Sequence, residues 1–348
     1  MIEGRRALAQ KCATITRRAG ITPAYATLRR LVVPDALAVL TYHRVGAEED
    51  EPWMGVSIPA DAFESQMKWL ASQCSVVPLI ECLDRLKSGK PLPRRCVAVT
   101  FDDGYHDNYA RAFPILKRYG IPALVNVVTG NVRDQCPFWW DRVKYALWYR
   151  DRLRRSSFDE QSRSWAPGSN RNVGRDISET VERLKLLTAA QRENEVRLVE
   201  EACGAVLPGA GGPRLVVSPE EIHEMAASGI DFGAHTESHC NVAIETDHGL
   251  AEMCGSKATL EEWLGREVRV FCYPNGDLTP AARDAVQQAG FGYALTADPG
   301  FVRFSTPALS IPRVPGGWTI ECLEFFLSGL FVDGWRLARS VGLLNGNI

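Results

Sequence analysis

Two adjacent carboxylates stand where a buried strand is predicted to end. Asp102 and Asp103 belong to the run TFDDGY at residues 100–105, which overlaps the end of the apolar, β-branched run CVAVTF at 96–101. The carboxyl ends of parallel strands face the loops that form active sites in α/β folds. Asp-Asp-Gly is also common in solvated turns, so this motif alone leaves both interpretations open.

A histidine pair follows another predicted strand, at residues 230–234. The run HTESH begins with His235 and ends with His239, and two imidazoles four residues apart on one face of a helical turn can reach one metal ion. By itself the spacing could be chance in a chain with six histidines. With the aspartates, however, one carboxylate and two histidines form the three-ligand set of an open catalytic site, and the second carboxylate is left as a base.

A turn motif, FCYPNGD at residues 271–277, ends a third apolar run. Pro-Asn-Gly is typical of turns, and a purely structural turn is one interpretation. The other is functional, because a fixed turn can aim a backbone N–H at an oxyanion.

Strands and helices are predicted to alternate between these motifs. Strands are expected at 36–42, 96–101, 123–128, 230–234, 268–272 and 293–296, and helices at 62–70, 79–86, 109–119, 219–228, 250–264 and 280–288. Repeated strand–helix units with apolar strands indicate an α/β fold with a parallel sheet, open or closed into a barrel.

Residues 131–213 interrupt this alternation and are predicted to be an insertion. The segment has an aromatic start, an Arg-rich middle, a helical stretch at 177–203 and a flexible return, LPGAGGP, at 207–213. Trp139, Trp140 and Trp148 could stack on sugar faces, although packing against the rest of the protein is the expected use of at least two of them.

The remaining segments are the two ends. Residues 1–33 are predicted to be a helical extension, 34–130 and 214–317 the main α/β unit, and 318–348 a helical tail. The tail has its apolar residues at helical spacing, either for packing on the body or for contact with a membrane surface. They are Leu323, Phe326, Leu327, Leu330 and Phe331.

Composition limits the classes of partner and compartment. The 348 residues have a net charge of -2, so no overall basic field favours nucleic acid, and a small or neutral ligand is expected. Ten cysteines without any CxxC pair suggest reduced, buried thiols. The first 20 residues lack the apolar core of a signal peptide, and no apolar run is long enough to span a membrane, so a cytoplasmic location is predicted.

In this order and setting, TFDDGY, HTESH and FCYPNG resemble the polysaccharide deacetylase family (NodB-homology domain, carbohydrate esterase family 4). The resemblance covers about residues 36–130 and 215–317, including YHRV near the first strand and SIPRV near the last. It implies a distorted, incomplete (β/α) barrel, here with a mainly helical insertion. It also implies removal of the N-acetyl group from an N-acetylated sugar or oligosaccharide, and lipid-linked substrates are included in that expectation.

The resemblance also assigns roles. Asp102 would be the general base, and Asp103, His235 and His239 would hold a divalent metal, usually zinc in similar proteins. The metal would polarise the acetyl carbonyl and a bound water. The turn would present a backbone N–H, best assigned to Asn275, to the tetrahedral oxyanion. Because ligand histidines must be neutral, activity is expected to fall below about pH 6 to 6.5.

Two family features have no match. Many members have an arginine where this chain has Cys272, so the usual orienting partner of the base is missing; Arg313 could supply that charge, or could form an unrelated salt bridge. The Leu-x-His motif, which often contributes a general acid, is also absent. His43, at the end of the first strand, is the predicted substitute, with His106 and His248 as competitors, unless it only bonds neighbouring loop backbone.

Two other functions stay open at this stage. One is a non-catalytic carbohydrate-binding protein of the same fold, although such proteins typically lose at least one of the four site residues. The other is the same metal chemistry on a non-sugar amide, because function belongs to the site and not to the fold.

Overall fold

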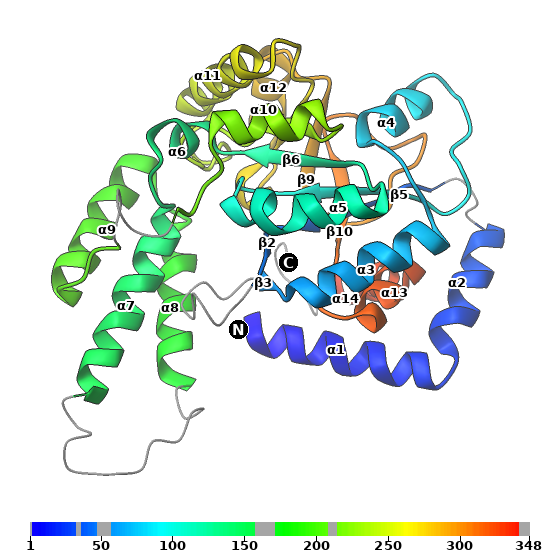
Figure 1. The fold of residues 1–348 in the computed structure, drawn as a ribbon, viewed down its shortest axis with the longest axis horizontal. Helices are drawn as coiled ribbons and strands as arrows, with labels where there is room; N and C mark the ends of the chain where they lie inside the picture. Colours follow the sequence, from blue (N-terminus) through cyan, green and yellow to red (C-terminus); the bar gives the residue numbers. More distant parts are fainter. Residues whose placement is uncertain (1, 33–35, 47–56, 157–170, 208–213, 341–348) are drawn as a thin grey trace.

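Seven parallel strands close into a barrel in the computed structural model, which describes residues 2–32, 36–46, 57–156, 171–207 and 214–340 (Figure 1). The order around the barrel is β1-β10-β9-β8-β7-β6-β5, and β5 pairs again with β1. The strands are β1 (Ala38–Tyr42), β5 (Cys96–Phe101), β6 (Ala123–Val127), β7 (Asp231–Ala234), β8 (Val270–Cys272), β9 (Tyr293–Pro299) and β10 (Ile311–Pro315). The predicted α/β barrel fold is therefore confirmed, with one strand fewer than the eight of a complete (β/α) barrel.

Short strands and helices complete this unit. The two-residue strand β4 (Ser75–Val76) extends the sheet beside β5, and β2 (Arg44–Val45) pairs with β3 (Ser57–Ile58). The surrounding helices are α3 (Ala60–Gln73), α4 (Leu79–Lys87), α5 (Phe113–Tyr119), α10 (Pro219–Ala227), α11 (Thr246–Leu264) and α12 (Pro280–Gln288). Every residue of β5 and β6 is buried, as expected for strands covered by helices outside and by side chains in the barrel interior.

Three predicted helices are interrupted for local reasons. The predicted helix at 109–119 begins as a wide turn at Asn108–Ala112 and becomes α-helical at Phe113, next to Pro114, which has no N–H to give to a regular helix. The predicted stretch at 177–203 is two helices, α8 (Arg171–Leu184) and α9 (Ala189–Cys203), because Thr188 and Gln191 form a capping box that starts α9.

The third interruption lies in the tail. It consists of α13 (Ile320–Ser328) and α14 (Leu330–Ser340), separated by Gly329 at φ 91°, a conformation that favours glycine. The described part of the tail is therefore two helices where one was expected.

The segment predicted as an insertion is helical and stands beside the barrel (Figure 1). It contains the end of α6 (Thr129–Asp134), all of α7 (Trp139–Ser156), α8 and α9. Trp139 and Trp140 are 7% and 9% exposed and belong to the main core, so two of the three tryptophans pack inside the protein as expected. The predicted return at 208–213 lies outside the described residues.

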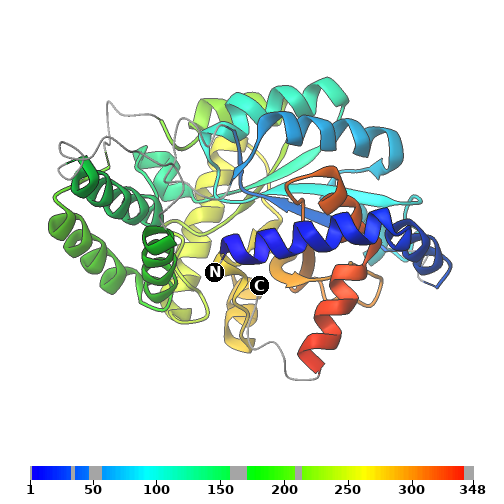
Figure 2. The ribbon, with the colours of Figure 1, turned by 90° about the horizontal axis from the view of Figure 1, so that it is seen from below.

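The N-terminal helices pack on the tail. α1 (Ile2–Arg18) and α2 (Ile21–Val32) contact α13, and Figure 2 shows α1 crossing the side of the molecule that faces the viewer. Leu323 and Phe326 of α13 are 0% and 2% exposed. The apolar face of the tail is thus largely covered by protein. Among the described helices, none combines the length and apolar character needed to cross a membrane.

Candidate active site

Asp102 forms a buried, bidentate ion pair with Arg313. Asp102 follows the last residue of β5, and Arg313 reaches it from β10, with Nη1 2.8 Å from Oδ1 and Nη2 2.7 Å from Oδ2. Burial alone would raise the pKa of Asp102, but the charge and hydrogen bonds of Arg313 outweigh this and hold the pKa well below its usual value. The site therefore keeps Asp102 ionised, and the charge that Cys272 cannot supply comes from Arg313.

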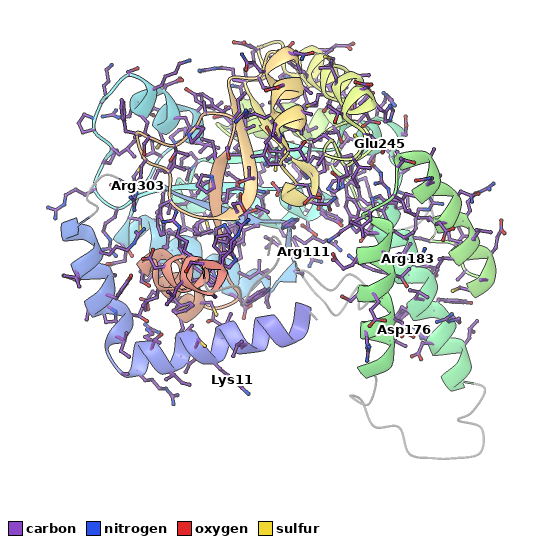
Figure 3. All side chains as sticks on the ribbon, turned by 180° about the vertical axis from the view of Figure 1, so that it is seen from behind. Lys11, Arg111, Asp176, Arg183, Glu245 and Arg303 are labelled. Carbon is purple, nitrogen blue, oxygen red and sulfur yellow. The ribbon has the colours of Figure 1, made fainter. Side chains whose placement is uncertain are left out.

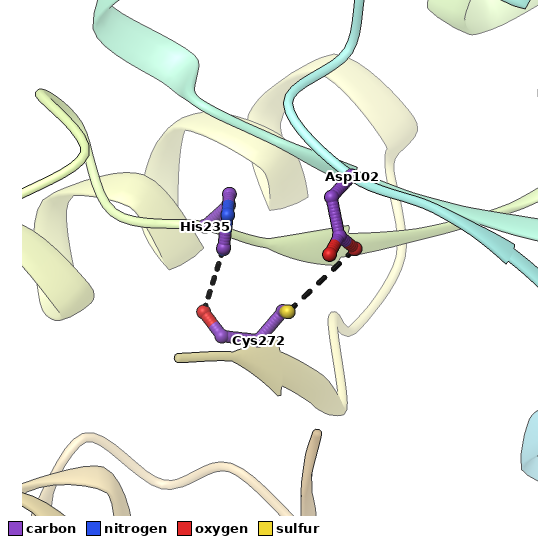
Figure 4. Close-up of side chains that lie close together, drawn as sticks. All are labelled: Asp102, His235 and Cys272. Carbon is purple, nitrogen blue, oxygen red and sulfur yellow. Dashed lines mark hydrogen bonds between the residues drawn. The ribbon is translucent and has the colours of Figure 1, made fainter. Parts of the chain in front are cut away.

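Two further groups orient Asp102. Asn126 of β6 donates from Nδ2 to Oδ1 of Asp102 over 2.7 Å and to the Phe101 carbonyl over 3.2 Å. Cys272, at the end of β8, approaches the same Oδ1 with its thiol over 3.6 Å, as Figure 4 shows. Sequence analysis missed Asn126; the available signal was a lone amide in an otherwise apolar strand, ALVNV. The other oxygen, Oδ2, accepts one bond from Arg313 and faces His43.

Asp103, His235 and His239 converge on one point. Oδ1 of Asp103 lies 3.6 Å from Nε2 of His235 and 3.7 Å from Nε2 of His239, and the ligand atoms of the three residues all lie within 4.8 Å of one another. Ligand atoms bound to one tetrahedral ion at about 2.1 Å are about 3.4 Å apart. The two distances from Asp103 are therefore close to the spacing around a small divalent ion, and the two histidine nitrogens lie within 4.8 Å of each other.

The imidazoles are prepared to act as neutral ligands. Nδ1 of His235 lies 2.7 Å from the Cys272 carbonyl, which fixes the proton on Nδ1 and leaves the Nε2 lone pair for the metal (Figure 4). Burial lowers the pKa of His235 to about 4 and also holds the pKa of His239 well below its usual value. Both rings are therefore uncharged at neutral pH.

The loop that carries the histidines is not the helical turn that the spacing suggested. Thr236 and His239 have φ of 64° and 55° and the chain bends at residues 237–238, so the loop is not helical, and the two rings meet edge to face at 4.8 Å. Glu252 of α11 holds this loop by accepting the Glu237 N–H at 3.0 Å, the Ser238 N–H at 2.8 Å and the Ser238 hydroxyl at 2.7 Å. Sequence reasoning did not identify Glu252, since it lies in a separate helix.

The electrostatics of Asp103 fit a bound cation. Burial, and then the neighbouring charges of Asp102 and Asp141, raise the pKa of Asp103 well above its usual value. No described Lys or Arg side chain forms a salt bridge with Asp103, whereas Asp102 beside it is neutralised by Arg313. A positive ion bound by Asp103 and the two histidines would supply the missing charge.

The insertion contributes a buried network to the same site. Trp140 of α7 lies edge to face on His239 at 4.6 Å and donates from Nε1 to the Tyr105 hydroxyl over 2.7 Å. That hydroxyl donates to Asp141, which is fully buried, over 2.8 Å. These contacts fix one face of His239. Sequence reasoning treated Trp140 only as packing or sugar stacking and missed Tyr105 and Asp141.

His43 lies at the site and its two competitors are engaged elsewhere. Nε2 of His43 is 3.9 Å from Oδ2 of Asp102, with 42% of the side chain exposed. His106 lies 3.4 Å from Glu221, and His248 lies 3.3 Å from Glu252 on α11. Of the three histidines considered as acids, His43 is thus the one placed against the base.

The turn that holds Asn275 is built as expected. It follows β8 as a short 3₁₀ turn, Pro274–Gly276, with Asn275 at φ 60°. A side chain at Gly276 would meet Ala297 of β9 at 2.2 Å, so the turn is packed tightly against the barrel. The role of the Asn275 N–H remains a prediction.

Known proteins with similar sequences include two deacetylase relatives. YxkH of Bacillus subtilis is 22% identical over 270 residues, which are 77% of this chain and 66% of YxkH. The poly-beta-1,6-N-acetyl-D-glucosamine N-deacetylase of Staphylococcus aureus is 42% identical over 80 residues, which are 23% of this chain and 27% of that protein. The matches therefore span slightly less than two thirds of the first relative and about a quarter of the second.

Two solved structures share the fold. The deacetylase PplD of Streptococcus pyogenes, solved with acetate, has a TM-score of 0.54 at 18% identity and covers 80% of this chain and 92% of that chain. IcaB of Ammonifex degensii has a TM-score of 0.53 at 22% identity and covers 84% and 97%. The sequence model of polysaccharide deacetylases matches residues 89–294, which is more than half of the chain. The chain therefore belongs to the polysaccharide deacetylase family.

Proposed function

We propose that this protein is a metal-dependent deacetylase that hydrolyses the acetamide of an N-acetylated sugar. The observation that carries the proposal is the pairing of two adjacent carboxylates in opposite electrostatic states. Asp102 is neutralised by Arg313, and Asp103 faces two neutral imidazoles and forms no salt bridge with any Lys or Arg of the described residues. One group suits a base and the other a metal ligand.

The divided roles give a simple hydrolytic scheme. A divalent ion, zinc by our proposal because its ligands are typically nitrogen and oxygen in a tetrahedral set, would polarise the acetyl carbonyl and acidify water when bound. Oδ2 of Asp102 would accept the proton of the attacking water. The Asn275 N–H would stabilise the oxyanion, and His43 would give a proton to the leaving amine, so that acetate and a free amine result.

Asp102 and His43 are close enough to share this task. The proton that Asp102 takes up from water and the proton that His43 releases belong to groups 3.9 Å apart. The pKa of His43 is lowered mainly by loss of hydration and raised in part by the charge of Asp102, so a proton held by His43 is readily released. The buried Arg313 prevents Asp102 from being protonated before substrate arrives.

The sugar is proposed to be an N-acetylhexosamine within a glycan or a lipid-linked glycan precursor. The 42% identical segment belongs to a protein named as an N-deacetylase of poly-beta-1,6-N-acetyl-D-glucosamine, which supports N-acetylglucosamine as the first substrate to test. We also propose a cytoplasmic location. It is supported by ten free cysteines, including Cys82 and Cys96, whose sulfurs lie 3.3 Å apart without a disulfide.

Acetate release tests the proposal directly. The purified protein, loaded with zinc, should release acetate from at least one member of a panel of N-acetylglucosamine oligomers, nucleotide sugars and lipid-linked sugars, and exhaustive chelation should abolish the release. Full activity after chelation would contradict the metal role. Hydrolysis of simple acetamides but of no sugar would show that the substrate is a non-sugar amide. Sugar binding without release of acetate would support a non-catalytic carbohydrate-binding protein.

A further inference from the structure

The first two helices carry a positive charge that the rest of the chain does not share. Residues 1–32 contain seven Lys or Arg and one acidic residue, a net charge of +6, and because the whole chain has a net charge of -2, the remainder carries -8. A segment with this charge, set in an acidic protein, favours an anionic partner at that end of the molecule.

The inner face of this helix pair is fixed to the tail. Ala13 is fully buried against α13, and Arg17 forms ion pairs with Glu321 and Glu324 of that helix. The Tyr25 hydroxyl of α2 donates to Asp333 of α14 over 2.8 Å. Because these contacts hold the inner face against the tail, the opposite face of the helix pair points to solvent.

The outer face combines basic and apolar side chains. Leu8, Lys11, Ile15 and Arg18 follow one another at spacings of three, four and three residues, which places them on one stripe of α1. Leu8 and Ile15 are 63% and 65% exposed, and Lys11 lies on the outer side of α1 in Figure 3.

The second helix also exposes apolar residues to solvent. Ile21, at the start of α2, is 47% exposed and Leu28 is 60% exposed. Four large aliphatic side chains therefore stand in water on two neighbouring helices that carry net positive charge. This combination is the signature of a helix that lies in the headgroup region of a bilayer.

We infer that the outer face of α1 and α2, defined by Leu8, Lys11, Ile15, Arg18, Ile21 and Leu28, docks on the surface of an anionic lipid bilayer. A second copy of the chain is a poorer occupant, because the same positively charged face would meet itself. The lower end of α7 reaches the same side of the molecule as α1 (Figures 1 and 2), so docking would also bring the insertion toward the bilayer. The inference does not depend on the proposed enzymatic activity.

Vesicle co-sedimentation of the whole protein tests this docking. Binding is expected to phosphatidylcholine vesicles that contain phosphatidylglycerol, to weaken as salt is raised, and to be absent with phosphatidylcholine alone. The Lys11→Gln/Arg18→Gln variant should bind about 30-fold more weakly, from about 1 kcal/mol for each basic residue at the membrane surface. Leu8→Ser/Ile15→Ser should also lose about tenfold or more, because buried aliphatic groups add affinity.

The matched control is Leu198→Ser, at a leucine of α9 that is 48% exposed and lies outside the helix pair. It should bind vesicles like the original protein, and all variants should keep the same thermal unfolding and the same mass in solution. The inference is overturned if anionic vesicles are not bound or if neutral vesicles are bound equally well. It is also overturned if the α1 variants bind normally, or if they dissociate a dimer in which α1 was covered.

Discussion

Two arginine–aspartate pairs at opposite ends of the barrel have the same geometry and different surroundings. Arg313 and Asp102 meet at the carboxyl ends of the strands with two contacts of 2.8 and 2.7 Å. Arg269, just before β8, and Asp84 of α4 meet at the other end with contacts of 2.9 and 2.6 Å. The first pair has side chains 4% and 4% exposed, the second 34% and 43%.

The two pairs have similar contacts, so burial is what makes the Arg313–Asp102 pair sensitive to the loss of either partner. The pKa of Asp84 is also lowered, mainly by its hydrogen bond to Arg269, yet this pair only joins α4 to the start of two strands, with the Tyr293 hydroxyl as a third member. In the buried pair, water cannot replace either partner. Substitutions in the Arg313–Asp102 pair should therefore change stability and activity strongly, and matched substitutions in the Arg269–Asp84 pair should change them little.

The largest effect is expected for Arg313→Met. It leaves Asp102 buried without its cation, which should lower the free energy of unfolding by about 3 to 5 kcal/mol. The pKa of Asp102 should rise at the same time, because burial raises it once the arginine is gone. Denaturant unfolding measures the first effect, and the pH dependence of acetate release measures the second as a shift of the acid limb toward higher pH.

Arg269→Met is the matched control for this variant. An exposed pair contributes at most about 1 kcal/mol, so stability should change by no more than that and the pH profile should not move. Equal losses of stability in the two variants would contradict the role given to burial.

The next effect concerns proton transfer at the same end of the barrel. His43→Ala should lower the rate of acetate release by about 100-fold or more while the metal stays bound, since a positioned acid contributes at least that factor. His106→Ala, at a histidine paired with Glu221, should keep nearly the original rate. Near-normal turnover of the His43 variant would remove the general acid from the scheme.

A smaller effect, on metal affinity, is expected for Glu252, which holds the loop that carries the two histidines. Glu252→Gln weakens the three hydrogen bonds that hold the loop between His235 and His239, and should lower metal affinity about tenfold, as is typical for groups that position ligands. Competition with a chelator measures this affinity. Unchanged affinity in a folded variant would show that the loop keeps its conformation without Glu252.

The smallest expected effect is the release of a proton from Asp103 when the metal binds. Because the pKa of Asp103 is raised while those of the histidines are lowered, Asp103 and not the histidines should limit metal binding in acid. Affinity should fall as pH drops through the pKa of Asp103, and the drop near pH 6 to 6.5 expected from ordinary histidines should be absent. Calorimetry in buffers of different ionisation enthalpy should detect up to one proton released per ion at any pH where Asp103 is protonated before the metal binds, and none for Asp103→Asn.

The sequence predicted the parts of this site that are local in the chain. Apolar runs that end in polar residues showed where Asp102, Asp103 and His235 leave their strands, and parallel topology brings such ends together. The resemblance to a family then separated the base from the ligand.

Contacts between distant segments could not be predicted in the same way. The spacing of His235 and His239 suggested a helical turn, but Glu252, some fifteen residues later, stabilises a loop with positive φ instead. Asn126 reaches Asp102 because β5 and β6 are neighbours in the barrel, and Tyr105 reaches Asp141 because α7 packs against the barrel. Neither periodicity nor residue type reveals these contacts. Arg313 was proposed as one of two alternatives, and only the fold places it against Asp102.

The most direct test compares the two adjacent aspartates in one experiment. For the original protein, Asp102→Asn and Asp103→Asn, bound zinc and acetate release from an N-acetylglucosamine oligomer are measured on the same samples. Asp102→Asn is expected to keep its zinc and to lose about 100-fold to 10,000-fold in rate, whereas Asp103→Asn should lose zinc first and activity with it. Loss of zinc in Asp102→Asn, with zinc retained in Asp103→Asn, would show that the base and the metal ligand have been assigned in the wrong order.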